Sequence, residues 1–193
     1  MSYNLKDVFY LGSTHEYAAA TYSSGGIEGV IPIDVSAYVD PISKGRQRGQ
    51  GLAIYKVHCQ VAGDSMGGMH IATDAGSASF GLTVKPYTTT GDSVTSIAAQ
   101  DLTPESDLAV YLASYIAPAS RAPGFGGGSE PAVSLEPSTE VPYVCVRDTI
   151  FQAFVTTVGM SSGDSYHVSY RMECAMISLD TATLNQLLRT QTA

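Results

Sequence analysis

The stretch Ser165-Tyr-His-Val-Ser-Tyr-Arg-Met-Glu-Cys-Ala-Met-Ile-Ser-Leu179 decides the fold class, because its residue types alternate with a period of two. One face would carry Val168, Tyr170, Met172, Cys174 and Met176, and the other His167, Ser169, Arg171 and Glu173. Successive side chains of a β-strand point to opposite faces of the sheet, whereas a helix repeats about every 3.6 residues. The stretch therefore predicts a long strand with one buried face.

The same alternation recurs along the chain. Residues 52–61 would turn Tyr55, Val57, Cys59 and Val61 to one side and Lys56, His58 and Gln60 to the other. Residues 78–85 place Phe80, Leu82 and Val84 on one face, and further strands are expected at 7–11, 27–38, 69–73, 93–98, 107–116, 143–147 and 149–158. Many short strands separated by turns are typical of an antiparallel β-sandwich or barrel. We expect an all-β chain.

The tripeptide Gly63-Asp64-Ser65 resembles the surroundings of a nucleophilic serine. It recurs at residues 91–93 and 163–165, each time between expected strands, and a catalyst does not need three copies. Glycine accepts positive φ, and Asp and Ser bond back to nearby amides, so the pattern suits a turn. A triad also needs a His held by an acid, and no His has a recognisable triad context. We interpret the three copies as exposed turns and expect no catalytic residue.

A helix is expected only at the end of the sequence. Asp180 can cap the segment 181–189, where Leu184, Leu187 and Leu188 form an apolar stripe and Arg189 suits the negative end of the helix dipole. Two longer stretches, 41–51 and the Pro/Gly-rich 118–142, interrupt the strand pattern, and the second is interpreted as a long surface loop. We expect residues 1–193 to form one β-sandwich domain.

The charge of the chain restricts its partners. The formal net charge is -8, with 10 Lys and Arg among 193 residues, so the molecule as a whole repels phosphate backbones. Three of these basic residues, Lys44, Arg46 and Arg48, stand within one short segment. They are the candidate for a local contact with nucleic acid or with a carboxylate of a partner protein, and a solvated loop is the alternative.

The metal-ligating and thiol residues predict no metal site and no cofactor. Cys59, Cys145 and Cys174 are scattered, without a CxxC pair or a close His, which favours buried thiols over a disulfide framework or zinc. The sequence has no HExxH motif, and Asp-x-Asp calcium loops are absent. No segment has the pattern of a signal peptide or the length of a membrane span, so we expect a soluble protein made inside the cell.

The 12 tyrosines are a further feature of the composition, since Trp is absent. Those at positions 10, 17, 22, 38, 55, 111, 115 and 143 lie in or beside expected strands. Tyrosine suits a strand surface or a subunit interface, where the ring buries area and the hydroxyl stays hydrated. The pattern predicts tyrosine-bearing contact surfaces, with a sugar-binding platform as the less favoured alternative.

The order of these features resembles the single jelly-roll coat proteins of small icosahedral viruses, especially the compact subunits of environmental single-stranded DNA viruses. The resemblance is carried by the strand segment Ile31-Pro-Ile-Asp-Val-Ser-Ala-Tyr38, the basic Gly-rich loop, the strand Gly51-Leu-Ala-Ile-Tyr-Lys-Val57, the long Pro/Gly loop and two closing strands. It covers most of the chain and includes no diagnostic motif.

That resemblance implies a jelly-roll sandwich with a structural role. The chain would assemble with copies of itself, and with other virion proteins, into a closed shell around the genome, and its place would be the virion. Members of this group often carry an Arg-rich N-terminal arm, which Met1-Ser-Tyr-Asn-Leu-Lys-Asp7 is not. Genome contact would therefore be weak or local, through Lys44, Arg46 and Arg48.

Two alternatives belong to other classes of protein. The chain could be a non-catalytic β-sandwich binding module of the phage-tail or adhesin type, which recognises a glycan or a receptor through its loops. It could also be a serine hydrolase with Ser65 as nucleophile, although the repeated turn pattern argues against this reading. We expect a capsid protein that is not an enzyme.

Overall fold

The computed structural model describes residues 8–17, 28–40, 48–63, 76–84, 89–90, 93–94, 104–117, 132–156 and 166–191. Strands dominate these ranges, and one α-helix follows the last strand. The elements are β1 (Phe9–Tyr17), β2 (Glu28–Asp34), a 3-10 turn (Ser36–Tyr38), β3 (Arg48–Gly63), β4 (Gly76–Thr83), β5 (Thr89–Thr90), β6 (Ser93–Val94), β7 (Ala109–Ala117), β8 (Ala132–Leu135), β9 (Tyr143–Cys145), β10 (Thr149–Thr156), β11 (Tyr166–Asp180) and α1 (Thr181–Thr190).

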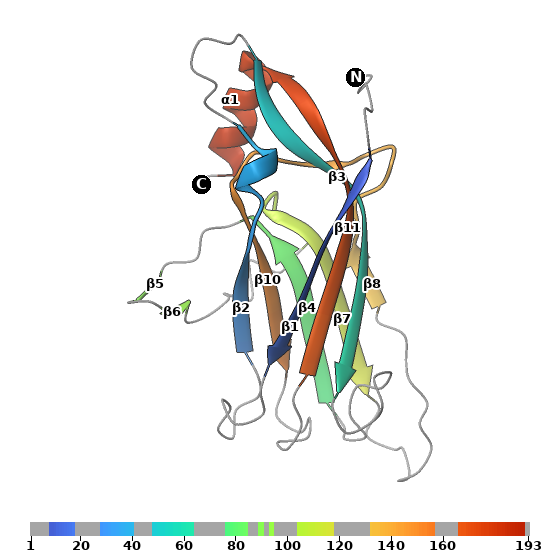
Figure 1. Ribbon diagram of the computed structural model, residues 1–193. Helices are drawn as coiled ribbons and strands as arrows, with labels where there is room; N and C mark the ends of the chain where they lie inside the picture. The colour runs from blue at the N-terminus through green and yellow to red at the C-terminus, as the bar shows by residue number, and fades with distance from the viewer. Residues whose placement is uncertain are drawn as a thin grey trace.

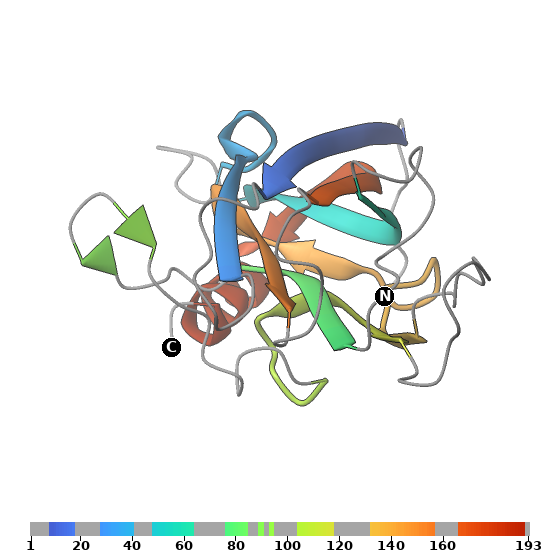
Figure 2. The ribbon, with the colours of Figure 1, turned by 90° about the horizontal axis from the view of Figure 1, so that it is seen from below.

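Two antiparallel sheets form the body of the molecule. The four-stranded sheet has the order β1-β11-β3-β9, and the five-stranded sheet has the order β2-β10-β4-β7-β8. Figure 1 shows the first sheet in front of the second, and the view from below in Figure 2 shows them as two layers. Nearly every neighbour within a sheet comes from a distant part of the chain, which is the jelly-roll arrangement. The predicted all-β sandwich of jelly-roll type with a short C-terminal helix is confirmed.

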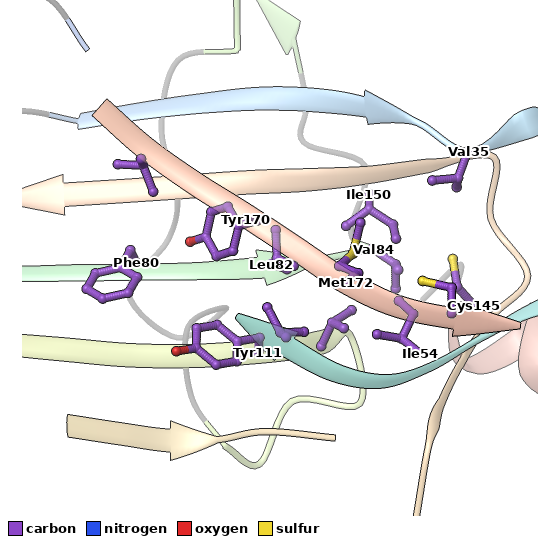
Figure 3. Packing of buried hydrophobic residues seen from close by; sticks show 14 of the residues in the cluster. Val35, Ile54, Phe80, Leu82, Val84, Tyr111, Cys145, Ile150, Tyr170 and Met172 are labelled. Carbon is purple, nitrogen blue, oxygen red and sulfur yellow. The ribbon is translucent and has the colours of Figure 1, made fainter. Parts of the chain in front are cut away.

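The core lies between the two sheets and is mostly apolar. Figure 3 shows Ile54, Leu82, Ile150 and Met172 pointing toward one another from four strands, and each is fully buried. A buried hydrogen bond also connects the layers. The amide of Gln152 on β10 donates to the carbonyl oxygen of Val168 on β11 at 3.1 Å. A buried amide has lost its hydrating water and therefore needs a hydrogen-bond partner. The bond across the core thus fixes the position of one sheet relative to the other.

The upper halves of β3 and β11 extend beyond the sandwich and pack against α1 (Figure 1). There Ala175, Ile177 and Leu179 are buried in a second apolar cluster with Leu184 of the helix. These odd-numbered residues share a strand face with Arg171 and Glu173, so the helix covers the face that is polar further down. The prediction that Met176 is buried is wrong, because its side chain is 45% exposed where the strand leaves the sandwich.

A β-bulge corrects the prediction for residues 52–61. Glu173 is opposite Lys56 but Cys174 is opposite Ile54, so Tyr55 is the extra residue of β3. Because Tyr55 has no partner in β11, the residues of β3 before and after it alternate in opposite phase between the two faces of the sheet. Val57 and Val61 pack in the sandwich core as predicted, whereas Tyr55 packs in the cluster beneath α1.

Helix α1 begins where the sequence predicts. The Asp180 carboxylate accepts a hydrogen bond from the Thr183 amide at 2.8 Å, which is the N-cap interaction. The end of the helix is fixed by Gln191, which is buried. Its side chain donates to the Val144 carbonyl at 2.7 Å and accepts from the Val146 amide at 3.0 Å. One glutamine thus bonds to the edge of β9 as a neighbouring strand would.

The connections between strands match the sequence less closely. The expected loop 118–142 contains β8 (Ala132–Leu135), a short strand that the Pro/Gly-rich composition concealed. Residues 118–131 lie outside the described ranges, as do the expected strand 69–73 and most of 93–98. Ser65 and the turn residues Asp64, Asp92 and Asp164 also fall there, so their exposure stays a prediction.

The tyrosines contradict the expectation of a tyrosine-rich surface. Tyr17, Tyr55, Tyr111 and Tyr170 are buried in the two apolar clusters. The rings of Tyr111 and Tyr170 meet edge to face with centroids 6.2 Å apart (Figure 3). Both rings pack in the core of the sandwich, and burial raises the pKa of Tyr170 well above its ordinary value because the phenolate would be desolvated. Tyr10 is the large exposed tyrosine of the described ranges.

Candidate binding surface on the four-stranded sheet

The outer face of β1, β11 and β3, which is toward the viewer in Figure 1, carries polar side chains in three rows. The register aligns each row across the three strands. From the end near α1 downward, the rows are Tyr10–Glu173–Lys56, Gly12–Arg171–His58 and Thr14–Ser169–Gln60. We call these residues the outer-sheet surface. The alternation predicted the polar side chains of β3 and β11 on this face, but the pairing of strands was needed to align them.

Arg171 leaves its own row and lies over Tyr10. Its guanidinium carbon is 3.9 Å from the centroid of the Tyr10 ring. A guanidinium over an aromatic face is attracted by the ring quadrupole, and its N–H groups remain available at the edges of the stack. Within the described part of the chain, no carboxylate contacts Arg171.

His58 leans in the same direction and contacts Glu173. His58 Nε2 lies 3.0 Å from Glu173 Oε1, and the two side chains are 48% and 27% exposed. The contact joins β3 to β11 on the polar face of the sheet. The contact also gives one Glu173 carboxylate oxygen a partner. Glu173 is directly opposite Lys56 in the pairing of β11 with β3. An exposed pair of this kind contributes little to stability, about 0–1 kcal/mol.

A groove opens in the middle row because its side chains lean away and Gly12 has none. Its volume is about 690 Å³, and its lining includes Gly12, Thr14, Ser169, Arg171, His58 and Gln60. A Cβ atom on Gly12 would lie 3.4 Å from the Tyr170 carbonyl oxygen, which is an ordinary contact. The backbone therefore does not require glycine at this position, and the consequence of the missing side chain is the open groove.

The hydroxyl groups below the groove form a pair. Thr14 Oγ1 and Ser169 Oγ are 3.0 Å apart across β1 and β11. Each hydroxyl can donate one hydrogen bond and accept more than one, so the pair keeps capacity for a ligand. The groove thus offers a cation on one side and hydroxyl and amide groups on the other.

A serine–histidine contact exists in the structure, but it lacks the rest of a catalytic site. Ser13 Oγ contacts His15 Nε2 along β1, and burial lowers the pKa of His15 because the charged ring would be desolvated. Among the residues described, no carboxylate contacts His15 to orient it as a triad requires. The described ranges also hold no group of three His, Cys, Asp or Glu side chains that could bind a metal ion.

The cysteines are free thiols, as predicted. Cys145 and Cys174 are buried and Cys59 is half-buried. Burial raises the pKa of each of the three thiols to about 12, because the thiolate would lose its hydration. Such thiols are poor nucleophiles and poor metal ligands at neutral pH.

The predicted basic segment is not placed by the structure. Lys44 and Arg46 lie outside the described residues, and Arg48 begins β3 without a described side chain. Their contact with nucleic acid or a partner remains a prediction. The sequence reasoning missed Arg171, Tyr10 and Gly12 as a group, because only the antiparallel register of β1 with β11 brings them together.

None of the helices that the structure describes has the length and apolar character needed to cross a membrane. No family model matches the sequence, and a search of curated proteins gives no significant match. Similarity to known proteins is therefore found only by comparing the folds.

The fold is similar to that of polyomavirus VP1 capsid proteins. Merkel cell polyomavirus VP1 in complex with 3'-sialyllactosamine matches with a TM-score of 0.52 at 11% identity, over 93% of this chain and 99% of that chain. The same VP1 in complex with GD1a oligosaccharide gives 0.52 at 10% identity over the same shares. Trichodysplasia spinulosa-associated polyomavirus VP1 in complex with GM1 oligosaccharide gives 0.50 at 9% identity, over 92% and 97%. At such identities the shared property is the jelly-roll fold of viral capsid proteins, and these neighbours are not enzymes.

Proposed function

We propose that the protein is a structural capsid protein that assembles with copies of itself into a virion shell around the genome. The observation that carries the proposal is the complete jelly-roll order of both sheets, which extends over 93% of this chain in the comparison with a VP1 protein. A fold alone does not determine a function, so the proposal also draws on the surface and the edges of this chain.

The edges of the sheets support assembly. β1 and β9 bound one sheet, and β2 and β8 bound the other. Edge strands offer backbone groups for pairing, and proteins commonly cover them. Gln191 already bonds to the outer edge of β9, and Pro32 lies in β2, where it removes an amide donor. β1 has nine residues, with neither a proline nor such a glutamine along it. We therefore propose that its outer edge is covered by a neighbouring subunit.

The composition of the surface points the same way. Charged residues are 15% of the chain, and Val141, Val8 and Val133 are exposed apolar side chains at 75%, 55% and 48%. A surface with so little charge suits a subunit whose sides are covered by other subunits. We propose other virion proteins as further partners and the virion as the location.

Contact with the genome would be local. We propose that Lys44, Arg46 and Arg48 supply it, since the net charge of -8 opposes a general attraction to nucleic acid. Replacing the three by Gln should reduce the nucleic acid recovered with particles and leave the particles intact. An unchanged ratio of nucleic acid to protein would contradict this role.

The second candidate function is a non-catalytic binding module for a glycan or receptor. The groove on the outer-sheet surface favours it, because a concave polar site is not needed for tiling a shell. The structural neighbours were solved with sialylated or ganglioside oligosaccharides, which are ligands of those proteins.

Negative-stain microscopy and size-exclusion chromatography of the recombinant chain test the main proposal. Closed particles or rings that form as salt is raised would support it, because salt screens the repulsion between subunits of net charge -8. A monomer that persists across a wide range of salt and protein concentration would contradict assembly.

A further inference from the structure

We propose that the groove over Gly12 binds a sugar acid, meaning a ligand with one carboxylate and several hydroxyl groups. The inference deepens the second candidate function by naming a site and a class of ligand. It does not depend on shell assembly. Four properties of the groove carry it: a cation that no carboxylate of the described residues contacts, neighbouring acidic groups, paired hydroxyls and open space.

The cation is Arg171. Tyr10 holds its guanidinium from one side at 3.9 Å, and the described residues place no carboxylate against it. In a chain of net charge -8, acidic groups are in excess, so an arginine without one is unusual. The guanidinium fork matches the two oxygens of a carboxylate. Because the tyrosine ring already limits its motion, less conformational entropy is lost on binding.

The neighbouring acids limit the charge of the ligand. Glu173 lies one row above Arg171, and Glu16 is exposed on the same face at the far end of β1. A polyanion such as a nucleic acid would bring several phosphates close to these carboxylates and to a molecule of net charge -8. A ligand with a single negative group pairs that group with Arg171 and meets much less of this repulsion. The surroundings therefore favour a monoanion over a phosphate chain.

The lower row supplies partners for hydroxyl groups. Thr14 and Ser169 form a hydroxyl pair at 3.0 Å, and Gln60 adds an amide in the same row. His58 stands on the other side, fixed by its 3.0 Å contact with Glu173. These groups can both donate and accept hydrogen bonds, as the hydroxyls of a sugar do. An acidic amino acid has a carboxylate but no ring hydroxyls, so it would use only half of the site.

Space for the ligand comes from Gly12. The groove of about 690 Å³ is within the range of small-molecule sites. A Cβ on Gly12 would meet only the Tyr170 carbonyl oxygen at 3.4 Å, so a larger side chain can be placed there without moving the backbone. Substitution of Gly12 therefore provides a way to fill the groove while keeping the fold.

Titration of the purified full-length chain with glucuronate, followed by NMR or calorimetry, tests the proposal. Glucose is the neutral control, and glutamate and inorganic phosphate are the anion controls. We expect glucuronate to bind more tightly than any of the three. Arg171→Gln should weaken glucuronate binding by about 10-fold or more, the loss typical of a charge-assisted pair. Arg189→Gln, which removes an exposed arginine of α1, should leave binding unchanged.

Gly12→Val adds a second, independent variant. It keeps every charge and fills the groove, and valine is favoured in strands, so we expect a folded protein that no longer binds glucuronate. Equal binding of glucuronate, glutamate and phosphate would overturn the assignment to a sugar acid, because the hydroxyl row would then contribute nothing. No binding of glucuronate, or binding that survives both Arg171→Gln and Gly12→Val, would overturn the site itself. Microscopy of the same variants reports on assembly separately, so failure of this site leaves the capsid proposal standing.

Discussion

The guanidinium of Arg171 on β11 lies over the ring of Tyr10 on β1, 3.9 Å from its centroid. The pair connects neighbouring strands on the outer-sheet surface and moves the arginine away from Gly12. We expect Tyr10→Phe to keep glucuronate binding, because phenylalanine preserves the ring face, and Tyr10→Ala to weaken it several-fold. Since Tyr10 is half exposed, both variants should remain folded, and Tyr10→Ala should lower the free energy of unfolding by at most about 1 kcal/mol. Equal affinities for the two variants would show that the ring does not position Arg171.

Gln191 gives a prediction about stability. Gln191→Ala leaves the Val144 carbonyl and the Val146 amide without their side-chain partner. We expect the free energy of unfolding to fall by about 1–3 kcal/mol, the usual effect of leaving buried polar groups unpaired. The measurement is a denaturant titration followed by circular dichroism. Gln186→Ala, at an exposed position of the same helix, is the matched control and should change stability by less than about 0.5 kcal/mol. A similar loss in both variants would contradict a specific role for Gln191.

Two glycines of the four-stranded sheet, on strands separated by β11, should respond differently to alanine. A Cβ on Gly51 would lie 2.9 Å from Leu179 Cδ1 and 3.2 Å from the Cys145 carbonyl oxygen. The second contact is with backbone, so β9 has to shift, and we expect Gly51→Ala to cost about 1–3 kcal/mol. Gly12→Ala meets an ordinary contact at 3.4 Å and should be neutral or slightly stabilising. Thermal unfolding of both variants decides the matter, and equal melting temperatures would refute the packing argument.

The thiols give the expected dependence on pH. Burial raises the pKa of Cys59, Cys145 and Cys174 from the ordinary value of 9.0 to about 12. Above 9.0 the thiols of the unfolded chain lose protons that the folded chain keeps, so the free energy of unfolding falls as the pH rises from 9.0 toward about 12. Below 9.0 both states keep these protons, and the contribution is constant.

Urea titrations at about pH 8 and about pH 10 measure this effect, and the midpoint should be lower at the higher pH. Labelling with a thiol reagent is the parallel readout. The folded chain should react slowly at about pH 8, and the chain in denaturant should react at all 3 cysteines. Rapid labelling of the folded chain would show that the thiols are accessible.

The sequence predicted most of the sandwich, because the alternation of Val168, Tyr170 and Met172 with polar residues follows from the geometry of a half-buried strand. It also predicted the start of α1, since an Asp before a helical stripe has a local physical cause. It failed where distant parts of the chain decide burial. Met176 is exposed because the sandwich ends below it, and the bulge at Tyr55 has no local signal.

The candidate site could be predicted only in part. The alternation placed His58 and Glu173 on the polar faces of their own strands, and the structure brings these two faces together by pairing β3 with β11. The sequence alone indicates no role for Gly12. Its missing side chain leaves a groove only because Arg171 of β11 is the residue opposite. Sequence patterns report the faces of one strand at a time, whereas a groove requires knowledge of which strands are neighbours.

The place of β11 between β1 and β3 has a consequence for synthesis on the ribosome. β11 is made after both strands that it joins, so the emerging chain cannot close the four-stranded sheet until residues 166–180 have left the ribosome. The β4–β7 pair can form earlier, because its strands are closer in the chain. Nascent or truncated chains thus lack the outer-sheet surface and the docking site of α1 together. The order of translation itself would keep incomplete subunits from entering an assembly.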